Sequence, residues 1–211
     1  MRTLSIGGNQ LDAYHVCAFF DSRQQEYAVL TPFYQEAVAQ REKNLHIVAD
    51  ELRDDHMARL RDAGVDTHHC AACGQLEVLT WRQAYLNEDG AFDKDRMLAT
   101  VEALTRNAAA GEFTGLRIMG NMAWVFAGLP GAEDIIEYEA EVNEVLARNR
   151  QPAICVYDTA QLTGSMMMDL LRTHPLTLIN GVIQENPYFT PPREMLDELR
   201  RRGAASSASA T

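Results

Sequence analysis

The sequence has no long hydrophobic run and relatively few basic residues. No apolar stretch approaches the roughly 20 residues that a membrane-spanning helix needs, and the opening residues Met1–Gly8 lack the hydrophobic core of a signal peptide. The 30 acidic residues outnumber the 19 basic ones and give a net charge of -11, whereas nucleic acid and anionic lipid bind to clustered lysine and arginine. We therefore predict a cytoplasmic protein that makes no direct contact with nucleic acid or membrane.

A phosphate-binding loop is also absent. Such a loop needs glycines, so that backbone N–H groups converge on the phosphate, and a lysine to meet its charge. The junction after the first predicted strand reads Asp21-Ser-Arg-Gln-Gln-Glu26, with neither glycine nor lysine. The chain likewise has no nucleophile elbow and no HExxH motif. We therefore predict a protein that is not an enzyme and does not hydrolyse ATP by the usual mechanism.

What is present is an alternation of short apolar runs with helical patterns. Strands are predicted at 14–20, 45–49, 76–80, 116–119 with an extension over 123–126, 153–157 and 176–179. Helices are predicted at 27–40, 54–63, 93–110, 135–149, 165–173 and 195–202. Continuously apolar strands that alternate with helices indicate an α/β protein with a mainly parallel sheet, flanked by helices on both faces.

One domain over residues 11–202 is the economical interpretation of this alternation. Residues 1–10 would then be an N-terminal extension. Residues 203–211 are nearly all alanine and serine, and such small side chains bury too little surface to offset their ordering entropy. We therefore predict a disordered tail.

Four cysteines are too few for a disulfide framework in a chain of 211 residues. His15 and Cys17 lie two apart on the first strand and share one face. Imidazole and thiolate together suit zinc or copper, and Cys155 and His174 would complete a ligand set if the fold brings them close. The alternative is that both thiols are small buried apolar groups and His15 is a hydrogen-bonded core residue.

A second cysteine–histidine run is His68-His69-Cys70-Ala-Ala-Cys73. The Cys70-x-x-Cys73 spacing matches half of a structural zinc site, for which His68 and His69 could supply the remaining ligands. A redox pair would more typically begin a helix, whereas this run is predicted to form a short loop before a strand. Incidental loop residues, a metal site and a redox pair therefore stay open.

Further polar residues are candidates for a binding site. Asp158 follows the fifth strand, and open parallel sheets bind ligands outside the carboxyl ends of their strands. Arg117 lies inside an apolar strand, where it must pair or meet an anion. Glu139 and Asn143 are four apart on one helix and face the same way. Tyr157 is a candidate wall for an apolar pocket.

Several segments together resemble the MEDS domain, a sensory domain of methanogens and methylotrophs. The resemblance covers residues 11–198 and rests on the order and spacing of the segments. These segments are His15-Val-Cys17, Glu36–Glu42 before Leu45-His-Ile-Val48, Asn121–Trp124, Tyr138–Asn143, Cys155–Asp158, His174-Pro175 and Asn186–Phe189. The chain departs from the family pattern at Asn121, where an acid is common.

The resemblance implies a RecA/KaiC-like three-layer sandwich without a working phosphate loop, which senses a small organic molecule or metabolite. Such domains are usually fused to an output domain. Because no such segment is evident here, we expect a stand-alone sensor that acts through a protein partner or by self-association. The resemblance carries ligand-binding roles to His15, Cys17, Glu139, Asn143, Cys155, Tyr157, Asp158 and His174.

We expect the ligand pocket at the carboxyl edge of the sheet. Its polar contacts would be His15, Cys17, Arg117, Tyr157 and Asp158. The alternative function is a metal- or thiol-redox sensor that uses the cysteine and histidine residues, with zinc as the candidate ion.

Overall fold

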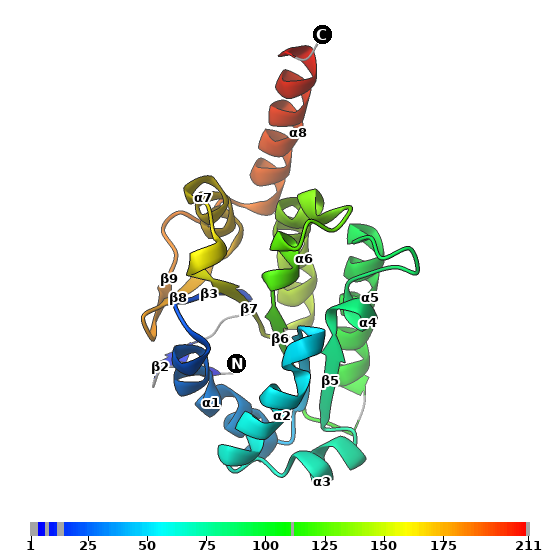
Figure 1. Ribbon diagram of the computed structural model, residues 1–211, viewed down its shortest axis with the longest axis vertical. Helices are drawn as coiled ribbons and strands as arrows, with labels where there is room; N and C mark the ends of the chain where they lie inside the picture. The colour runs from blue at the N-terminus through cyan, green and yellow to red at the C-terminus, as the bar shows by residue number, and fades with distance from the viewer. Residues whose placement is uncertain (1–3, 7–8, 12–14, 111, 210–211) are drawn as a thin grey trace.

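The computed structural model describes residues 4–6, 9–11, 15–110 and 112–209 (Figure 1). Its centre is a seven-stranded sheet with the order β5-β4-β6-β7-β3-β8-β9. The strands are β3 (His15–Phe20), β4 (Lys43–Val48), β5 (Leu76–Thr80), β6 (Leu116–Asn121), β7 (Ala153–Asp158), β8 (Leu176–Ile179) and β9 (Val182–Glu185). All neighbours are parallel except β8 and β9. The predicted mainly parallel sheet is therefore confirmed.

Helices cover both faces of this sheet (Figure 1). One face carries α1 (Arg23–Ala39), α2 (Arg53–Asp62) and α3 (Thr67–Ala72). The other carries α5 (Lys94–Ala110), α6 (Ile135–Asn149), α7 (Gly164–Thr173) and α8 (Pro192–Ser209). The remaining elements are the hairpin β1 (Leu4–Ile6) and β2 (Asn9–Leu11), α4 (Trp81–Ala84), and the 3-10 turns η1 (Asp50–Leu52), η2 (Ala123–Phe126), η3 (Ala132–Asp134) and η4 (Thr159–Gln161).

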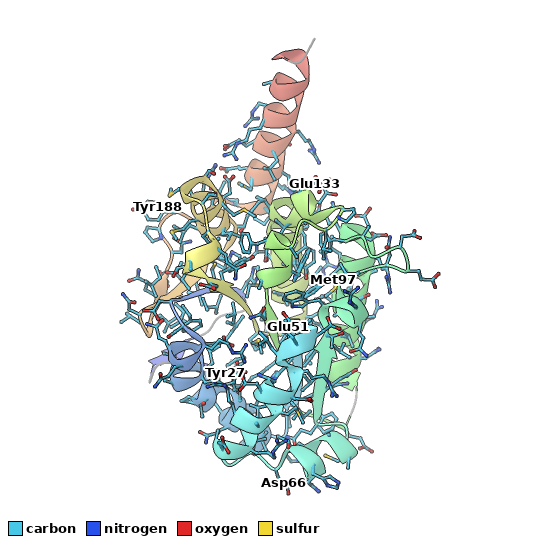
Figure 2. The ribbon with its side chains drawn as sticks, in the orientation of Figure 1. Tyr27, Glu51, Asp66, Met97, Glu133 and Tyr188 are labelled. Atoms are coloured by element: carbon cyan, nitrogen blue, oxygen red, sulfur yellow. The ribbon has the colours of Figure 1, made fainter. Side chains whose placement is uncertain are left out.

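Strand β3 shows why there are two apolar cores. Successive side chains of a strand point to opposite faces, so Val16 and Ala18 pack under α1 while Cys17 and Phe19 pack under the α5–α6 layer. Met97 of α5 is buried in that second layer (Figure 2). Since β3 is central and buried on both faces, its sequence reads as a continuous apolar run.

The chain turns out of the sheet after Asn121, where the sequence predicts that the strand continues. Residues 123–126 form η2 instead, and this part of the prediction is wrong. The indole of Trp124 is fully buried, stacked on Tyr85 at 5.0 Å between ring centroids and packed against Phe92 at 4.7 Å. Aromatic packing of this kind holds the segment against the sheet's helical layer. Apolar character alone does not distinguish such a turn from a strand.

Helix α8 extends beyond the body of the protein (Figure 1). It continues to Ser209, so residues 203–209 are helical where the sequence predicts a disordered tail. Alanine has the highest helix propensity, and no proline interrupts the segment after Pro192. The predicted loop around Cys70 is also wrong, since Asp66 caps α3 by accepting from the His69 amide. No helix in the described part of the chain is long and apolar enough to cross a membrane.

Candidate functional site

Four ionisable side chains from separate elements meet between the sheet and the α6–α7 layer. His15 begins β3, Glu139 lies on α6, Cys155 lies on β7 and His174 directly follows α7. All four are buried, with Cys155 the most exposed at 8%. One ligand-type atom of each side chain lies within 4.8 Å of the other three. These four residues, here called the buried cluster, could hold a metal ion.

The distances within the buried cluster are short. The Nε2 atom of His15 lies 3.2 Å from the Oε2 atom of Glu139 and 3.4 Å from the Sγ atom of Cys155. The same carboxylate oxygen lies 3.5 Å from His174 Nε2 and 3.7 Å from Cys155 Sγ. The two imidazole rings are 4.0 Å apart between centroids. One oxygen of Glu139 is thus the common neighbour of the other three side chains.

Surrounding groups fix the orientation of the two histidines. The Nδ2 of Asn143 donates to the backbone carbonyls of Glu139 and Thr173, both at 2.7 Å. Its Oδ1 therefore faces His15 Nδ1 at 3.0 Å and requires a proton on that nitrogen. His174 Nδ1 likewise donates to the Leu170 carbonyl at 2.8 Å. In a neutral imidazole the other nitrogen is then unprotonated, and in both rings that nitrogen, Nε2, faces the cluster.

The Tyr157 hydroxyl and burial influence the protonation states of Glu139, His174 and Cys155. The Tyr157 hydroxyl donates to Glu139 Oε1 at 2.6 Å, which leaves Oε2 for the cluster. Burial raises the pKa of Glu139, but His174, His15 and this hydrogen bond outweigh it and lower the pKa well below the usual carboxyl range. Burial also lowers the pKa of His174 to about 3 and raises that of the Cys155 thiol. The cluster therefore holds an anionic carboxylate, a neutral imidazole at His174 and a protonated thiol.

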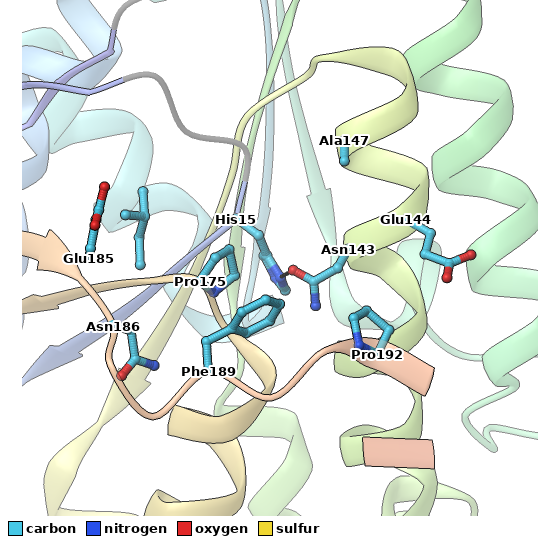
Figure 3. A pocket seen from close by; sticks show the side chains of 10 residues that line it. His15, Asn143, Glu144, Ala147, Pro175, Glu185, Asn186, Phe189 and Pro192 are labelled. Atoms are coloured by element: carbon cyan, nitrogen blue, oxygen red, sulfur yellow. Dashed lines mark hydrogen bonds between the residues drawn. The ribbon is translucent and has the colours of Figure 1, made fainter. Parts of the chain in front are cut away.

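A pocket of about 550 Å³ opens beside the cluster. It is lined by His15, Asn143, Glu144, Ala147, Pro175, Leu176, Glu185, Asn186, Phe189 and Pro192. Figure 3 shows the side chains of His15 and Asn143 pointing toward one another, with the Phe189 ring close by. His15 and Leu176 are the first residues of their parallel strands, so this pocket lies at the amino edge of the sheet.

The carboxyl edge, where the sequence analysis expects the pocket, holds a smaller cavity of about 120 Å³. Tyr157 and Asp158 line it together with Arg23 and Glu26. Asp158 is exposed and caps η4 by accepting from the Ala160 amide. Asp158 is therefore at the opposite edge from His15, and the expected polar set is divided between the two ends of the sheet.

The other predicted site residues are divided in the same way. Cys17 is fully buried and lies opposite Cys155 in the strand register, but it is not one of the four cluster residues. Arg117 lies on the other face of the sheet, where it pairs with Glu42 and, at 2.7 Å, with Glu36. Its guanidinium also covers the Phe33 ring at 4.9 Å. As predicted for a buried arginine, Arg117 forms ion pairs, but these pairs lie on the face of the sheet opposite the buried cluster.

The residues His68, His69, Cys70 and Cys73 do not converge. The side chain of Cys70 packs from α3 into the core, whereas His68, His69 and Cys73 are exposed. His68 lines one surface depression, while His69 and Cys73 line another. Within the described ranges, these four residues form no group of closely spaced metal-ligand atoms.

Sequence reasoning missed a second buried polar group on the α1–α2 face. His46 Nδ1 and His56 Nε2 are hydrogen-bonded at 2.8 Å, and His56 Nδ1 is hydrogen-bonded to the Tyr27 hydroxyl. Glu26 is 4% exposed beside them. Burial raises its pKa to about 7, although Arg23 and Arg59 act in the opposite direction. The sequence does contain an indication of this group, because His46 is a polar residue within an otherwise apolar strand.

The fold is a RecA-like α/β sandwich. The structure of a KaiC-like protein from Pyrococcus horikoshii OT3 superposes with a TM-score of 0.56 over 82% of this chain and 74% of that one, at 11% identity. This likeness confirms the expected fold.

The chain belongs to the MEDS family, the methanogen/methylotroph DcmR sensory domain, whose sequence pattern it matches over residues 14–175. It is also 24% identical over 163 residues to the transcriptional repressor DcmR of Methylorubrum extorquens. That alignment covers 76% of this chain and 57% of the repressor, so the chain spans little more than half the repressor's length. The family confirms the resemblance inferred from the sequence and assigns the chain a sensory, regulatory role.

Proposed function

We propose that the protein is a non-catalytic sensor whose small organic ligand occupies the amino-edge pocket. The observation that carries this proposal is that His15 belongs both to the pocket wall and to the buried cluster. The volume of about 550 Å³ is in the range of small-molecule sites, roughly 300–1,000 Å³. Apolar walls from Pro175, Leu176 and Phe189 beside a few fixed polar groups are also typical of such sites.

The lining favours a neutral or cationic ligand. Two of the ten lining residues are the acidic Glu144 and Glu185, and none is lysine or arginine. An anionic ligand would therefore lose its hydration without gaining a strong counter-charge. The amide of Asn143 is held rigidly by three backbone carbonyls, so its position is fixed before a ligand enters.

In this proposal, ligand binding changes the position of α8, and this change is the signal that the sensor transmits. Phe189 and Pro192 line the pocket and lead directly into that helix. Arg172 of α7 ties α8 down through Glu198, with two contacts of 2.8 and 2.6 Å. A ligand shifts an equilibrium only if its affinities for the two states differ. A ligand that touches Phe189 and Pro192 meets this requirement, and α8 would transmit the change to a protein partner or a second copy.

The test uses a substitution that fills the pocket but leaves the buried cluster intact. Ala147 is exposed on α6 and lines the pocket, so Ala147→Trp places an indole in the ligand volume. The matched control is Ala28→Trp, at an exposed alanine of α1 on the opposite face. A panel of small uncharged organic molecules is screened by ligand-observed NMR. We expect binders that Ala147→Trp abolishes and Ala28→Trp keeps. Binders that both variants retain would contradict the assigned pocket.

A further inference from the structure

In the buried cluster, the unpaired ring nitrogen of His174 faces a carboxylate oxygen of Glu139, and no hydrogen bond is formed between them. His174 donates from Nδ1 to the Leu170 carbonyl, and its Nε2 is buried without a hydrogen-bond partner. That nitrogen faces the Glu139 carboxylate oxygen at 3.5 Å. A cation between these atoms would satisfy both of them.

The spacing of the four atoms is that of a tetrahedral metal site. Zinc bonds of about 2.0–2.3 Å to nitrogen, oxygen and sulfur place neighbouring ligand atoms about 3.3–3.8 Å apart. The contacts from Glu139 Oε2 to His15, His174 and Cys155 measure 3.2, 3.5 and 3.7 Å, and that between His15 Nε2 and Cys155 Sγ measures 3.4 Å. Four of the six edges of a tetrahedron therefore have close to the required length, and the remaining two are no longer than 4.8 Å.

The charges of the four side chains balance those of a divalent ion. Two neutral imidazoles, the Glu139 carboxylate and a Cys155 thiolate sum to two negative charges, so a divalent cation makes the buried site neutral. Binding breaks the S–H bond of Cys155, forms a sulfur–metal bond and releases one proton to the solvent, with no change of oxidation state. Without the cation, the site keeps a buried carboxylate whose compensation is only partial.

The groups around the ligands have the arrangement that metal sites require. A metal-bound histidine usually donates its second ring nitrogen to a carbonyl or carboxylate, and a bound carboxylate is itself hydrogen-bonded. His15 meets this condition through Asn143 Oδ1, His174 through the Leu170 carbonyl, and Glu139 through the Tyr157 hydroxyl. Three of the four ligand side chains are thereby held in place by neighbouring groups outside the cluster.

We propose that His15 Nε2, Glu139 Oε2, Cys155 Sγ and His174 Nε2 bind one divalent cation of the zinc class. A site closed by four protein ligands is typical of structural rather than catalytic zinc. The ion would join β3, β7, α6 and the junction between α7 and β8 behind the wall of the amino-edge pocket. The site does not depend on the proposed function, because it would fill whether or not an organic ligand occupies the pocket.

The experiment measures metal binding by the full chain. The protein is stripped with a chelator and then titrated with Zn²⁺ or Co²⁺ alone. We expect one ion per chain, an increase in Tm, and a Co²⁺ spectrum with tetrahedral ligand-field bands and a thiolate-to-cobalt charge-transfer band. Tyr157→Phe removes only the hydroxyl that orients Glu139 and should weaken binding about 10–100-fold. Cys155→Ser should remove the charge-transfer band.

Two controls separate this site from the other cysteines. Cys17→Ala removes the neighbouring thiol of β3, and the double variant Cys70→Ala/Cys73→Ala removes both thiols of the α3 region. Both should keep the stoichiometry and the spectrum of the wild type. The proposal is overturned if the wild type binds no stoichiometric ion, if its cobalt spectrum lacks the thiolate band, or if a control rather than Tyr157→Phe weakens binding. These readouts use no organic ligand, so they fail or succeed independently of the pocket test.

Discussion

The buried Glu26 makes a prediction about stability and pH. Burial raises the pKa of this carboxyl from 4.5 to about 7, because the desolvation of the charged form exceeds the opposing attraction of Arg23 and Arg59. The folded state therefore holds its proton more tightly than the unfolded state does. The contribution of Glu26 to stability is fully present below about pH 4.5 and is lost as the pH rises through about 7.

The size of the effect follows from the shift. A difference of 7 minus 4.5 in pKa corresponds to about 3 kcal/mol at about 1.4 kcal/mol per unit. Glu26→Gln keeps the shape of the side chain and removes the titration. The free energy of unfolding of the variant should therefore rise relative to the wild type by up to about 3 kcal/mol between pH 4.5 and pH 8.

The assay is urea denaturation of both proteins at intervals of half a pH unit. Burial lowers the folded-state pKa values of His46, His56 and His174 below the ordinary value of 6.5, so these groups also stabilise the fold as the pH rises toward 6.5. Both proteins contain these histidines, so their contribution cancels in the difference between the two curves. A difference that stays constant across this range would refute the assignment of Glu26 as a buried protonated carboxyl.

Three further substitutions test the fold. Arg117→Met removes the buried cation that compensates Glu42. The free energy of unfolding, measured by urea denaturation, should fall by about 3–5 kcal/mol. A loss below about 1 kcal/mol would show that the ion network contributes little to stability. Gly131→Ala places a methyl group against the Phe92 carbonyl at a φ of 80° and should cost at least about 1–3 kcal/mol, which calorimetry would detect as a lower Tm. Arg172→Ala breaks the contacts with Glu198 and should accelerate hydrogen exchange in α8 while leaving α6 unchanged, whereas equal protection in both proteins would show that this ion pair does not hold the helix.

The sheet could be predicted well from the sequence, because its strands are buried on both faces and read as apolar runs. Four segments show where prediction of secondary structure from the sequence fails. Residues 123–126 are as apolar as a strand but turn to bury Trp124. Strand β9 is short and mostly exposed, yet Asn180-Gly181 before it is a hairpin signal, and both residues have positive φ values of 51° and 77°. Helix α3 was missed, and α8 was predicted only as far as residue 202, because the residues concerned are small or polar and capping or propensity decides their structure.

The buried cluster could be predicted only in part. His15, Cys155 and His174 were recognised as a ligand set that required the fold to bring them close, but the fourth member proved to be Glu139 rather than Cys17. Helical spacing related Glu139 only to Asn143. Its approach to His15 depends on how α6 crosses the sheet, which is a tertiary property, and the local pattern carries no information on it.

Of the two cavities at the edges of the sheet, the larger lies at the amino edge. In sheets of this type the first strand-to-helix junction leaves space for a ligand at the carboxyl edge. Here Arg23 and Glu26 from that junction line a cavity of only about 120 Å³. At the opposite edge, the segment after β9 folds over the starts of β3 and β8 and encloses about 550 Å³. Since α8 follows this segment directly, a ligand at the amino edge can act on a projecting helix, whereas a ligand at the carboxyl edge would contact no part of it.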